Sequence, residues 1–326
     1  MKAVVTGAAG FIGSSLTDRL LSDGWEVIGI DSFVAYYPRA LKERNLAQAL
    51  ANPRFMFVEG DLRDVVTGSH TSVSPHQILD GTAVVFHQAA QAGVRASWGR
   101  DFSIYCDNNI LATQVLLEAC RHYPGLKVVY ASSSSVYGET RKFPMEETDL
   151  PAPVSPYGVS KLAAEHLMNL YHVNFGLHAV SLRYFTVYGP RQRPDMAFHK
   201  LCRAALTGEE FVLFGTGEQT RDFTYIDDIV EANLAAAGLG RPGGVYNLGG
   251  GTRISMNDVV VLVEELSGRR VNVKRIGRHE GDVTHTGACV ERARHDFGFA
   301  PKVDLRTGLA RELEFVEKVV LALPHQ

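Results

Sequence analysis

Short runs of apolar, β-branched residues alternate with longer amphipathic stretches along the first half of the chain. Five runs have the length and composition of buried strands: Lys2–Thr6, Glu26–Ile30, Arg54–Val58, Ala83–His87 and Lys127–Ala131. The stretches with helical periodicity between them are Phe11–Ser22, Arg39–Leu50 and Phe102–His122. Such alternation predicts right-handed βαβ units, and therefore a parallel sheet covered by helices on both faces.

The pattern changes after Arg183. Before it, Pro156–Asn174 reads as a helix that begins with a favoured first-turn proline, and His178–Arg183 as a strand. Beyond it the segments shorten and Gly and Arg gather, which predicts a smaller, loop-rich α/β domain. We therefore expect an α/β fold in which a doubly wound parallel sheet is built from residues 1–183 and regains 224–248. Residues 184–223 and 249–326 would form the smaller domain.

Composition narrows the functional classes. The 326 residues carry a formal net charge of −3, which gives no basic footprint for nucleic acid. No stretch is long and apolar enough to span a bilayer. The four cysteines are scattered, without the spacing of a metal site or a disulfide framework. We expect no metal, no membrane partner and a reducing cytoplasmic location.

A glycine-rich turn follows the first strand. Gly7, Gly10 and Gly13 have the spacing GxxGxxG, and Phe11 and Ile12 stand between them at the start of a helix. Such a turn lets the backbone approach a pyrophosphate, whose charge then lies at the helix N-terminus. The segment predicts a dinucleotide site.

Carboxylates after the next two strands support this prediction. Asp31 ends the second strand, where it can accept hydrogen bonds from both ribose hydroxyls. Its charge repels a 2′-phosphate, so NAD is favoured over NADP. Asp61 and Leu62, after the third strand, suit an adenine pocket.

Tyr157 and Lys161 lie four residues apart, on one face of the predicted helix. A tyrosine of ordinary pKa, about 10, is a poor base at neutral pH. A nearby ammonium group and an oxidised nicotinamide both favour the phenolate. The phenolate can then take a proton from an alcohol whose carbon gives hydride to the cofactor.

These motifs resemble those of the extended short-chain dehydrogenase/reductases, the nucleotide-sugar epimerases and dehydratases. The resemblance covers nearly the whole length. It is carried by the motifs above and by Gln88, Ala89, Ala90, Asn109, Ser132–Gly138, Arg183–Pro190, Arg221–Asp227, Gly281 and Asp282.

The resemblance implies a Rossmann-type domain with a smaller nucleotide-sugar-binding domain. It places Gln88, Ala89, Ala90 and Asn109 at the cofactor and makes Ser133 the catalytic hydroxyl. It implies that Arg221 and Asp282 hold the diphosphate and ribose of the substrate. It also implies a homodimer that pairs through helices 102–122 and 156–174.

The serine run separates the branches of the family. Sugar dehydratases that resemble this chain carry Asp-Glu after the catalytic hydroxyl, and UDP-glucuronate decarboxylases carry Glu at the second position. This chain has Ser134 and Ser135, which cannot do carboxylate acid/base work near neutral pH. A 4-epimerase, which oxidises and then reduces the same carbon, is therefore favoured.

Other residues indicate which group the sugar carries at C5. The segment from Thr186 to Met196 and the segment around Arg95 resemble those of UDP-glucuronate 4-epimerases. Hydroxyls of Ser134, Ser135 and Thr186 would cradle a carboxylate, and Arg193 would supply charge. For Arg95, a substrate contact and a structural ion pair stay open.

Three alternatives remain. A UDP-glucose/UDP-galactose 4-epimerase needs the same catalytic residues, and the hydroxyl-lined pocket does not exclude it. UDP-glucuronate decarboxylase comes next, weakened by Ser135. A non-catalytic NAD-binding sensor is disfavoured because Tyr157, Lys161 and Ser133 are all present.

Overall fold

The computed structural model describes residues 1–69 and 73–322, so the predicted range 249–326 extends past the described chain. Seven parallel strands form its central sheet, in the order β10-β6-β5-β4-β1-β2-β3. The strands are β1 (Lys2–Thr6), β2 (Glu26–Asp31), β3 (Phe55–Glu59), β4 (Thr82–His87), β5 (Lys127–Ser133), β6 (His178–Tyr184) and β10 (Val245–Leu248). The predicted Rossmann-type fold is confirmed.

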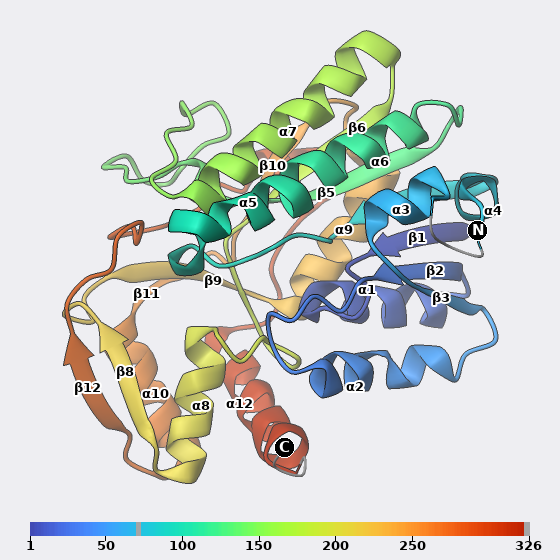
Figure 1. Ribbon diagram of the computed structural model, residues 1–326. Helices are drawn as coiled ribbons and strands as arrows, with labels where there is room; N and C mark the ends of the chain where they lie inside the picture. Colours follow the sequence, from blue (N-terminus) through green and yellow to red (C-terminus); the bar gives the residue numbers. More distant parts are fainter. Residues whose placement is uncertain (70–72, 323–326) are drawn as a thin grey trace.

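Alternating side chains of the strands feed two apolar layers. In β1, Ala3 and Val5 join the core on one face, while Val4 joins the core on the other. The first face is covered by α1 (Phe11–Ser22), α2 (Arg39–Leu50) and α9 (Ile226–Leu239) (Figure 1). The second is covered by α3 (Leu62–Thr67), α4 (Pro75–Leu79), α6 (Ala112–Cys120) and α7 (Pro156–Phe175), with α5 (Phe102–Tyr105) beside them.

The second half of the chain adds a separate layer below one end of the large sheet (Figure 1). Its strands form a three-stranded sheet, β11-β9-β7, and a parallel pair, β12-β8. They are β7 (Thr186–Tyr188), β8 (Glu210–Phe214), β9 (Thr220–Tyr225), β11 (Arg253–Ser255) and β12 (Asn272–Ile276). The helices are α8 (Ala197–Thr207), α10 (Met256–Ser267), α11 (Glu291–Phe297) and α12 (Leu305–Phe315).

The predicted smaller α/β domain has loops at its glycine-rich segments and packed helices between them. Helices α8, α10 and α12 pack against one another and bury an apolar face that the glycine-rich loops between them obscure in the sequence. The division into two domains stays a prediction. The sheets follow it closely: α9 and β10 return to the large sheet, whereas Thr224 and Tyr225 still belong to the small sheet.

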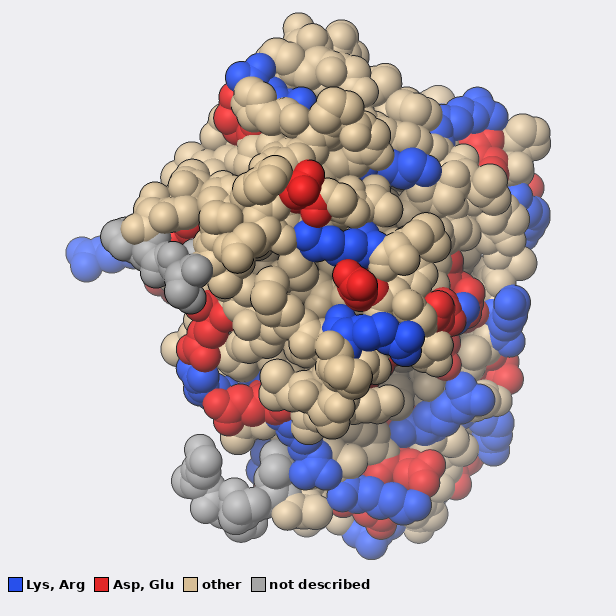
Figure 2. Space-filling view, turned by 90° about the vertical axis from the view of Figure 1, so that its right-hand side faces the viewer, with Lys and Arg blue, Asp and Glu red and all other residues tan. Residues whose placement is uncertain are grey.

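Two further features of the described residues bear on function. None of their helices combines the length and apolar character that a membrane crossing requires. On the face shown in Figure 2, basic and acidic side chains are interspersed rather than gathered by sign.

The order of the strands reverses between β1 and β4, because β2 lies on one side of β1 and β4 on the other. The connections that leave the carboxyl ends of these two strands therefore run in opposite directions and leave a crevice, the usual ligand site of an open α/β sheet. The glycine-rich turn after β1 lies at this point.

Candidate active site

A cavity opens at the crevice, and the glycine turn forms its floor. Gly7 has a φ of +68°, and a Cβ there would lie 2.8 Å from the backbone nitrogen of Ala89. At Gly13 a Cβ would lie 2.0 Å from the carbonyl oxygen of Gly7. Only glycine lets the turn close this tightly against β4 and against the first turn of α1.

The first turn of α1 presents free N–H groups to this cavity. Gly10 is the N-cap and gives no side-chain cap, and the first turn holds no acidic residue. Phe11, Ile12 and Gly13 line the cavity. An uncapped helix N-terminus of this kind attracts an anion, and a pyrophosphate would satisfy its donors.

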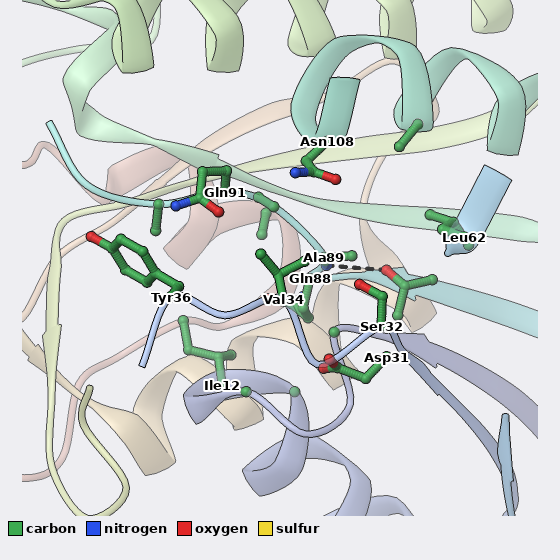
Figure 3. A pocket seen from close by; sticks show the side chains of 18 of the residues that line it. Ile12, Asp31, Ser32, Val34, Tyr36, Leu62, Gln88, Ala89, Gln91 and Asn108 are labelled. Atoms are coloured by element: carbon green, nitrogen blue, oxygen red, sulfur yellow. Dashed lines mark hydrogen bonds between the residues drawn. The ribbon is translucent and has the colours of Figure 1, made fainter. Parts of the chain in front are cut away.

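Asp31 lies at the end of β2, beside the glycine turn (Figure 3). Its two carboxylate oxygens accept from the backbone N–H groups of Ala9 at 3.0 Å and Phe33 at 2.9 Å. Burial raises the pKa of Asp31, and these two hydrogen bonds act in the opposite direction. The carboxylate is fixed in place at the rim, with lone pairs left for two ribose hydroxyls.

Asp61 and Leu62 both line this cavity, but their side chains have different partners. Leu62 is buried at one end of the cavity, with Tyr36 at the other (Figure 3). The carboxylate of Asp61 caps α3 through the N–H of Arg63 and also pairs with the Arg63 guanidinium at 2.6 Å. The apolar wall for an adenine is therefore supplied by Leu62, while the Asp61 side chain is largely committed to Arg63.

Gln88, Ala89 and Ala90 line the cavity above the turn. The N–H of Ala89 donates to the Thr6 hydroxyl at 3.1 Å, so that hydroxyl can give its own proton to Nδ1 of His87, 2.8 Å away. Nε2 of His87 lies 2.9 Å from the Thr113 hydroxyl, which donates to the carbonyl of residue 109. A neutral His87 protonated on Nε2 satisfies every donor and acceptor in this chain of hydrogen bonds.

We therefore expect the stability of the protein to depend on pH through His87. Burial, and then the charge of Lys161, lower the pKa of His87 from 6.5 to about 3. Below pH 6.5 the unfolded chain binds a proton that the folded chain excludes. The free energy of unfolding should fall with decreasing pH, by up to about 1.4 kcal/mol per pH unit from this group.

The measurement is urea unfolding at about pH 7.5 and about pH 5, for the wild type and for His87→Gln. The variant should lose less stability between the two pH values than the wild type does. Equal losses would show that His87 is not excluded from protonation in the folded state.

Asn109 does not line the cavity, contrary to the prediction. The helix between α5 and α6 widens into a π-helical turn, Cys106–Leu111, in which Asn109 is fully buried. Its amide exchanges two hydrogen bonds with the backbone of Gln91 and donates to the Ser160 hydroxyl at 2.8 Å. Asn109 thus joins the cavity wall to α7, and its neighbour Asn108 faces the cavity (Figure 3).

Tyr157 and Lys161 reach the same cavity from the first turns of α7. Burial lowers the pKa of Lys161 to about 7, although Glu165 acts in the opposite direction, and the ammonium lies 4.6 Å from the centre of the Tyr130 ring. Burial raises the pKa of Tyr157, while a hydrogen bond with Ser133 and the charge of Arg193 lower it. Burial outweighs these two effects, so the pKa of the phenol stays above its usual value.

The serine run turns at the end of β5. Ser132 lines the cavity, and the buried Ser133 contacts Tyr157 and accepts from the N–H of Ser135 at 3.1 Å. Ser134 and Ser135 open a short 3₁₀ helix, Ser134–Val136, and are half-buried. Ser135 lies beside the first turn of α7, where a Cβ on Gly158 would be 2.6 Å from its carbonyl oxygen. Among the described residues, both serines lie outside the walls of this cavity and of the second cavity described below.

A buried ion pair supports the catalytic helix from behind. Glu165, one turn after Lys161, binds the Arg183 guanidinium at 2.6 and 3.0 Å. The Ser132 hydroxyl donates to the same carboxylate at 2.7 Å. The pair therefore ties α7 to the ends of β5 and β6, from which the site residues project.

A second cavity lies between the small sheet and the segment 278–285. Arg221, half-buried and hydrogen-bonded only to backbone carbonyls among the described residues, lines it together with Thr186 and Asp282. Arg95 also lines it, but its guanidinium is bound to Asp282 at 2.7 Å and stacks 3.6 Å from the centre of the Phe214 ring. The structural ion pair left open for Arg95 is thus present.

Arg193 lines the first cavity together with Tyr157 and Lys161. The sequence brought out the main contributors to this cavity but missed part of its wall: Ser32, Val34, Gln91, Asn108 and Tyr184. Ser32 and Val34 continue the loop that begins with Asp31, so their neighbourhood gave a signal. For Asn108 no signal was available, because a π-helical turn decides which asparagine faces the cavity.

Comparison with known proteins agrees with this site. A family model described as the NAD dependent epimerase/dehydratase family matches residues 3–249. The chain belongs to this family. The epimerase/dehydratase is 44% identical to the uncharacterized UDP-glucose epimerase YtcB of Bacillus subtilis (strain 168), over 98% of this chain and 99% of that protein.

Two further relatives of this epimerase/dehydratase carry more specific names. A UDP-glucuronate 4-epimerase of Thermodesulfobacterium geofontis is 35% identical, over 96% of this chain and 95% of its own length. The crystal structure of UDP-glucuronic acid 4-epimerase from Bacillus cereus, in complex with UDP-glucuronic acid and NAD, is 43% identical with a TM-score of 0.92. That match covers 98% of this chain and 100% of the other.

Proposed function

We propose that this protein is an NAD-dependent 4-epimerase that interconverts UDP-glucuronate and UDP-galacturonate. One observation carries the proposal. Tyr157, the candidate base, lines one cavity together with Lys161, the cation Arg193 and the glycine-rich turn whose helix has no side-chain cap. The free donors of α1 and the fixed carboxylate of Asp31 fit NAD. The two named 4-epimerases above support the choice of sugar.

NAD held by the glycine turn and Asp31 would supply the group that takes up hydride from C4 of the sugar and gives it back. The protein's own part is to move one proton and to hold the sugar. Tyr157, as phenolate, takes the proton of the C4 hydroxyl, and Lys161 stabilises that phenolate. Ser133 hydrogen-bonds Tyr157 and is placed to hold the reacting oxygen. After the 4-keto sugar turns over, Tyr157 returns the proton, and the configuration at C4 is inverted.

The turning of the sugar requires firm binding of the nucleotide and looser binding of the hexose. We assign the nucleotide diphosphate to the second cavity, where the half-buried Arg221 has no hydrogen-bonded carboxylate partner among the described residues. Asp282 stands nearby for the ribose, and Arg95 holds Asp282 in place. The hexose then extends toward Thr186 and Arg193, which line the second and the first cavity.

A β-keto acid arises when UDP-glucuronate is oxidised at C4, and it loses carbon dioxide when its carboxylate bond aligns with the ketone. Ser134 and Ser135 stand where dehydratases and decarboxylases of the family carry carboxylates, and a serine hydroxyl cannot replace a carboxylate as general acid or base. This argues against both dehydration and decarboxylation. Incubation with UDP-glucuronate, followed by proton NMR and trapping of carbon dioxide, should give UDP-galacturonate with little pentose. Mostly UDP-pentose would make the protein a decarboxylase and overturn the proposal.

A second candidate is UDP-glucose/UDP-galactose 4-epimerase. It is favoured by the pairing of Arg193 with Asp195, which already satisfies part of the guanidinium. It also agrees with the name of the relative from Bacillus subtilis. UDP-glucose assayed under the same conditions separates the two, because a preference for the neutral sugar would reverse the ranking.

We further propose a cytoplasmic homodimer. All four cysteines are free, as in a reducing compartment. Exposed apolar side chains gather on the two helical segments expected to pair, 102–122 and 156–174. They are Ile104, Leu111, Val159, Leu170 and Val173. Light scattering of the purified protein tests the mass, and a monomer would contradict this assembly.

A further inference from the structure

Arg193 and Asp195 form an ion pair on the segment between β7 and α8. The guanidinium holds the carboxylate at two points: Nε donates to Oδ1 at 2.9 Å and Nη2 donates to Oδ2 at 3.0 Å. Tyr36, from the loop after β2, donates its hydroxyl to Oδ2 at 3.2 Å. The side chains are only 22% and 34% exposed, so this is not a loose surface pair.

The pair stands at the boundary of the two cavities. Arg193 lines the cavity that holds Tyr157 and Lys161, and Asp195 lines the cavity that holds Arg221 and Thr186. A sugar anchored by its diphosphate in the second cavity and reacting beside Tyr157 must pass this boundary. The charges of Arg193 and Asp195 therefore act directly on the group that the sugar carries at C5.

Asp195 is a carboxylate in this setting. Burial alone would raise its pKa, but the charge of Arg193 and hydrogen bonds from Arg193 and Tyr36 outweigh burial and hold the pKa below its usual value. An approaching sugar carboxylate thus meets a negative charge beside the cation that should bind it. Two like charges that share one guanidinium repel each other, and the partial burial of the pair limits the screening of that repulsion by solvent.

We propose that Asp195 is an internal counter-ion that competes with the sugar carboxylate for Arg193, and so sets the preference between acidic and neutral hexoses. One edge of a guanidinium fits one carboxylate bidentately, and Asp195 takes the edge formed by Nε and Nη2. The sugar carboxylate either displaces Asp195 from this edge or binds the other edge against its repulsion. Tyr36 keeps Asp195 satisfied when Arg193 turns away. The inference rests on the proposed function, since it concerns the same site.

The test compares kcat/KM for UDP-glucuronate with kcat/KM for UDP-glucose in the wild type and in Asp195→Asn. Removal of the competing charge should raise the ratio of the two values about tenfold. Asp195→Glu keeps the charge and should keep the ratio of the wild type. Asp80→Asn, the same change at an exposed carboxylate far from both cavities, should leave the ratio unchanged.

The readout is a ratio within one protein, so a general loss of folded enzyme does not alter it. An unchanged or lower ratio in Asp195→Asn would overturn the inference, because it would make Asp195 a residue that only positions Arg193. Failure of the proposed function looks different: the wild type would not epimerise UDP-glucuronate at all. In that case the dissociation constants of the two UDP-sugars decide, and Asp195→Asn must then bind UDP-glucuronate relatively more tightly than the wild type does.

Discussion

Replacing Tyr157 by Phe is expected to lower kcat for 4-epimerisation by a factor between about 10² and 10⁴, the usual contribution of a positioned acid/base. The variant keeps the ring, its half-buried position in the cavity wall and its edge-on contact with Tyr105, and loses only the hydroxyl. With that oxygen gone, no group in the described cavity replaces it between Ser133 and Lys161. The measurement is the initial rate of UDP-galacturonate formation at saturating UDP-glucuronate.

The loss should be confined to chemistry. Bound NAD, measured after denaturation of the purified protein, and the melting temperature should stay near those of the wild type. Tyr123→Phe removes a phenol from the far side of the molecule, where the ring stacks on His76, and should keep full activity. A Tyr157→Phe variant with more than about a tenth of the wild-type kcat would remove Tyr157 from the acid/base role.

Replacing Arg183 by Met is expected to destabilise the protein by about 3–5 kcal/mol, the range for a buried ion pair that loses one partner. The side chains of Arg183 and Glu165 are 4% and 6% exposed. Burial opposes the charge on Arg183, but the hydrogen bonds and charge of Glu165 outweigh it and raise the pKa of the guanidinium. Removal of Arg183 leaves the Glu165 carboxylate buried, and among the described residues the Ser132 hydroxyl is then its remaining hydrogen-bond donor. Urea unfolding near neutral pH measures the change.

Two controls separate this effect from a general sensitivity to lost charge. Arg306→Met breaks an ion pair with Glu265 in which both side chains are more than half exposed, and should cost less than about 1 kcal/mol. The double variant Arg183→Met/Glu165→Leu should recover part of the lost stability, because no charge is then left buried. If the double variant is no more stable than Arg183→Met, the penalty comes from lost packing instead.

The sequence predicted the large sheet well because local signals and tertiary packing agree there. Strands β1, β2 and β4 are apolar runs bounded by glycine or polar residues, and each ends at or within one residue of the predicted limit. Helices α1 and α2 match their predicted bounds. The glycine turn was predictable for the same reason, since its conformation admits few other residues.

Other parts of the site depend on contacts that no local pattern encodes. Whether Asn108 or Asn109 faces the cavity depends on a π-helical turn. The Asp61 side chain looked available in the sequence, yet Arg63, two residues later, binds it. Nothing in the sequence singles out Asp195, because its role depends on contacts with Arg193 and with Tyr36, which lies 159 residues earlier in the chain. The catalytic pair, by contrast, is local to one helix and could be read directly.

The uncapped first turn of α1 has a consequence for how the protein treats its cofactor. Its donors have no side-chain cap, so the bound dinucleotide completes the helix as well as the active site. A dehydrogenase must release its reduced cofactor after each turnover and would expose these donors each time. An epimerisation regenerates NAD in place, so the molecule never has to part with it. The cofactor can therefore serve as a permanent piece of the architecture, acquired once when the chain folds and kept through every cycle.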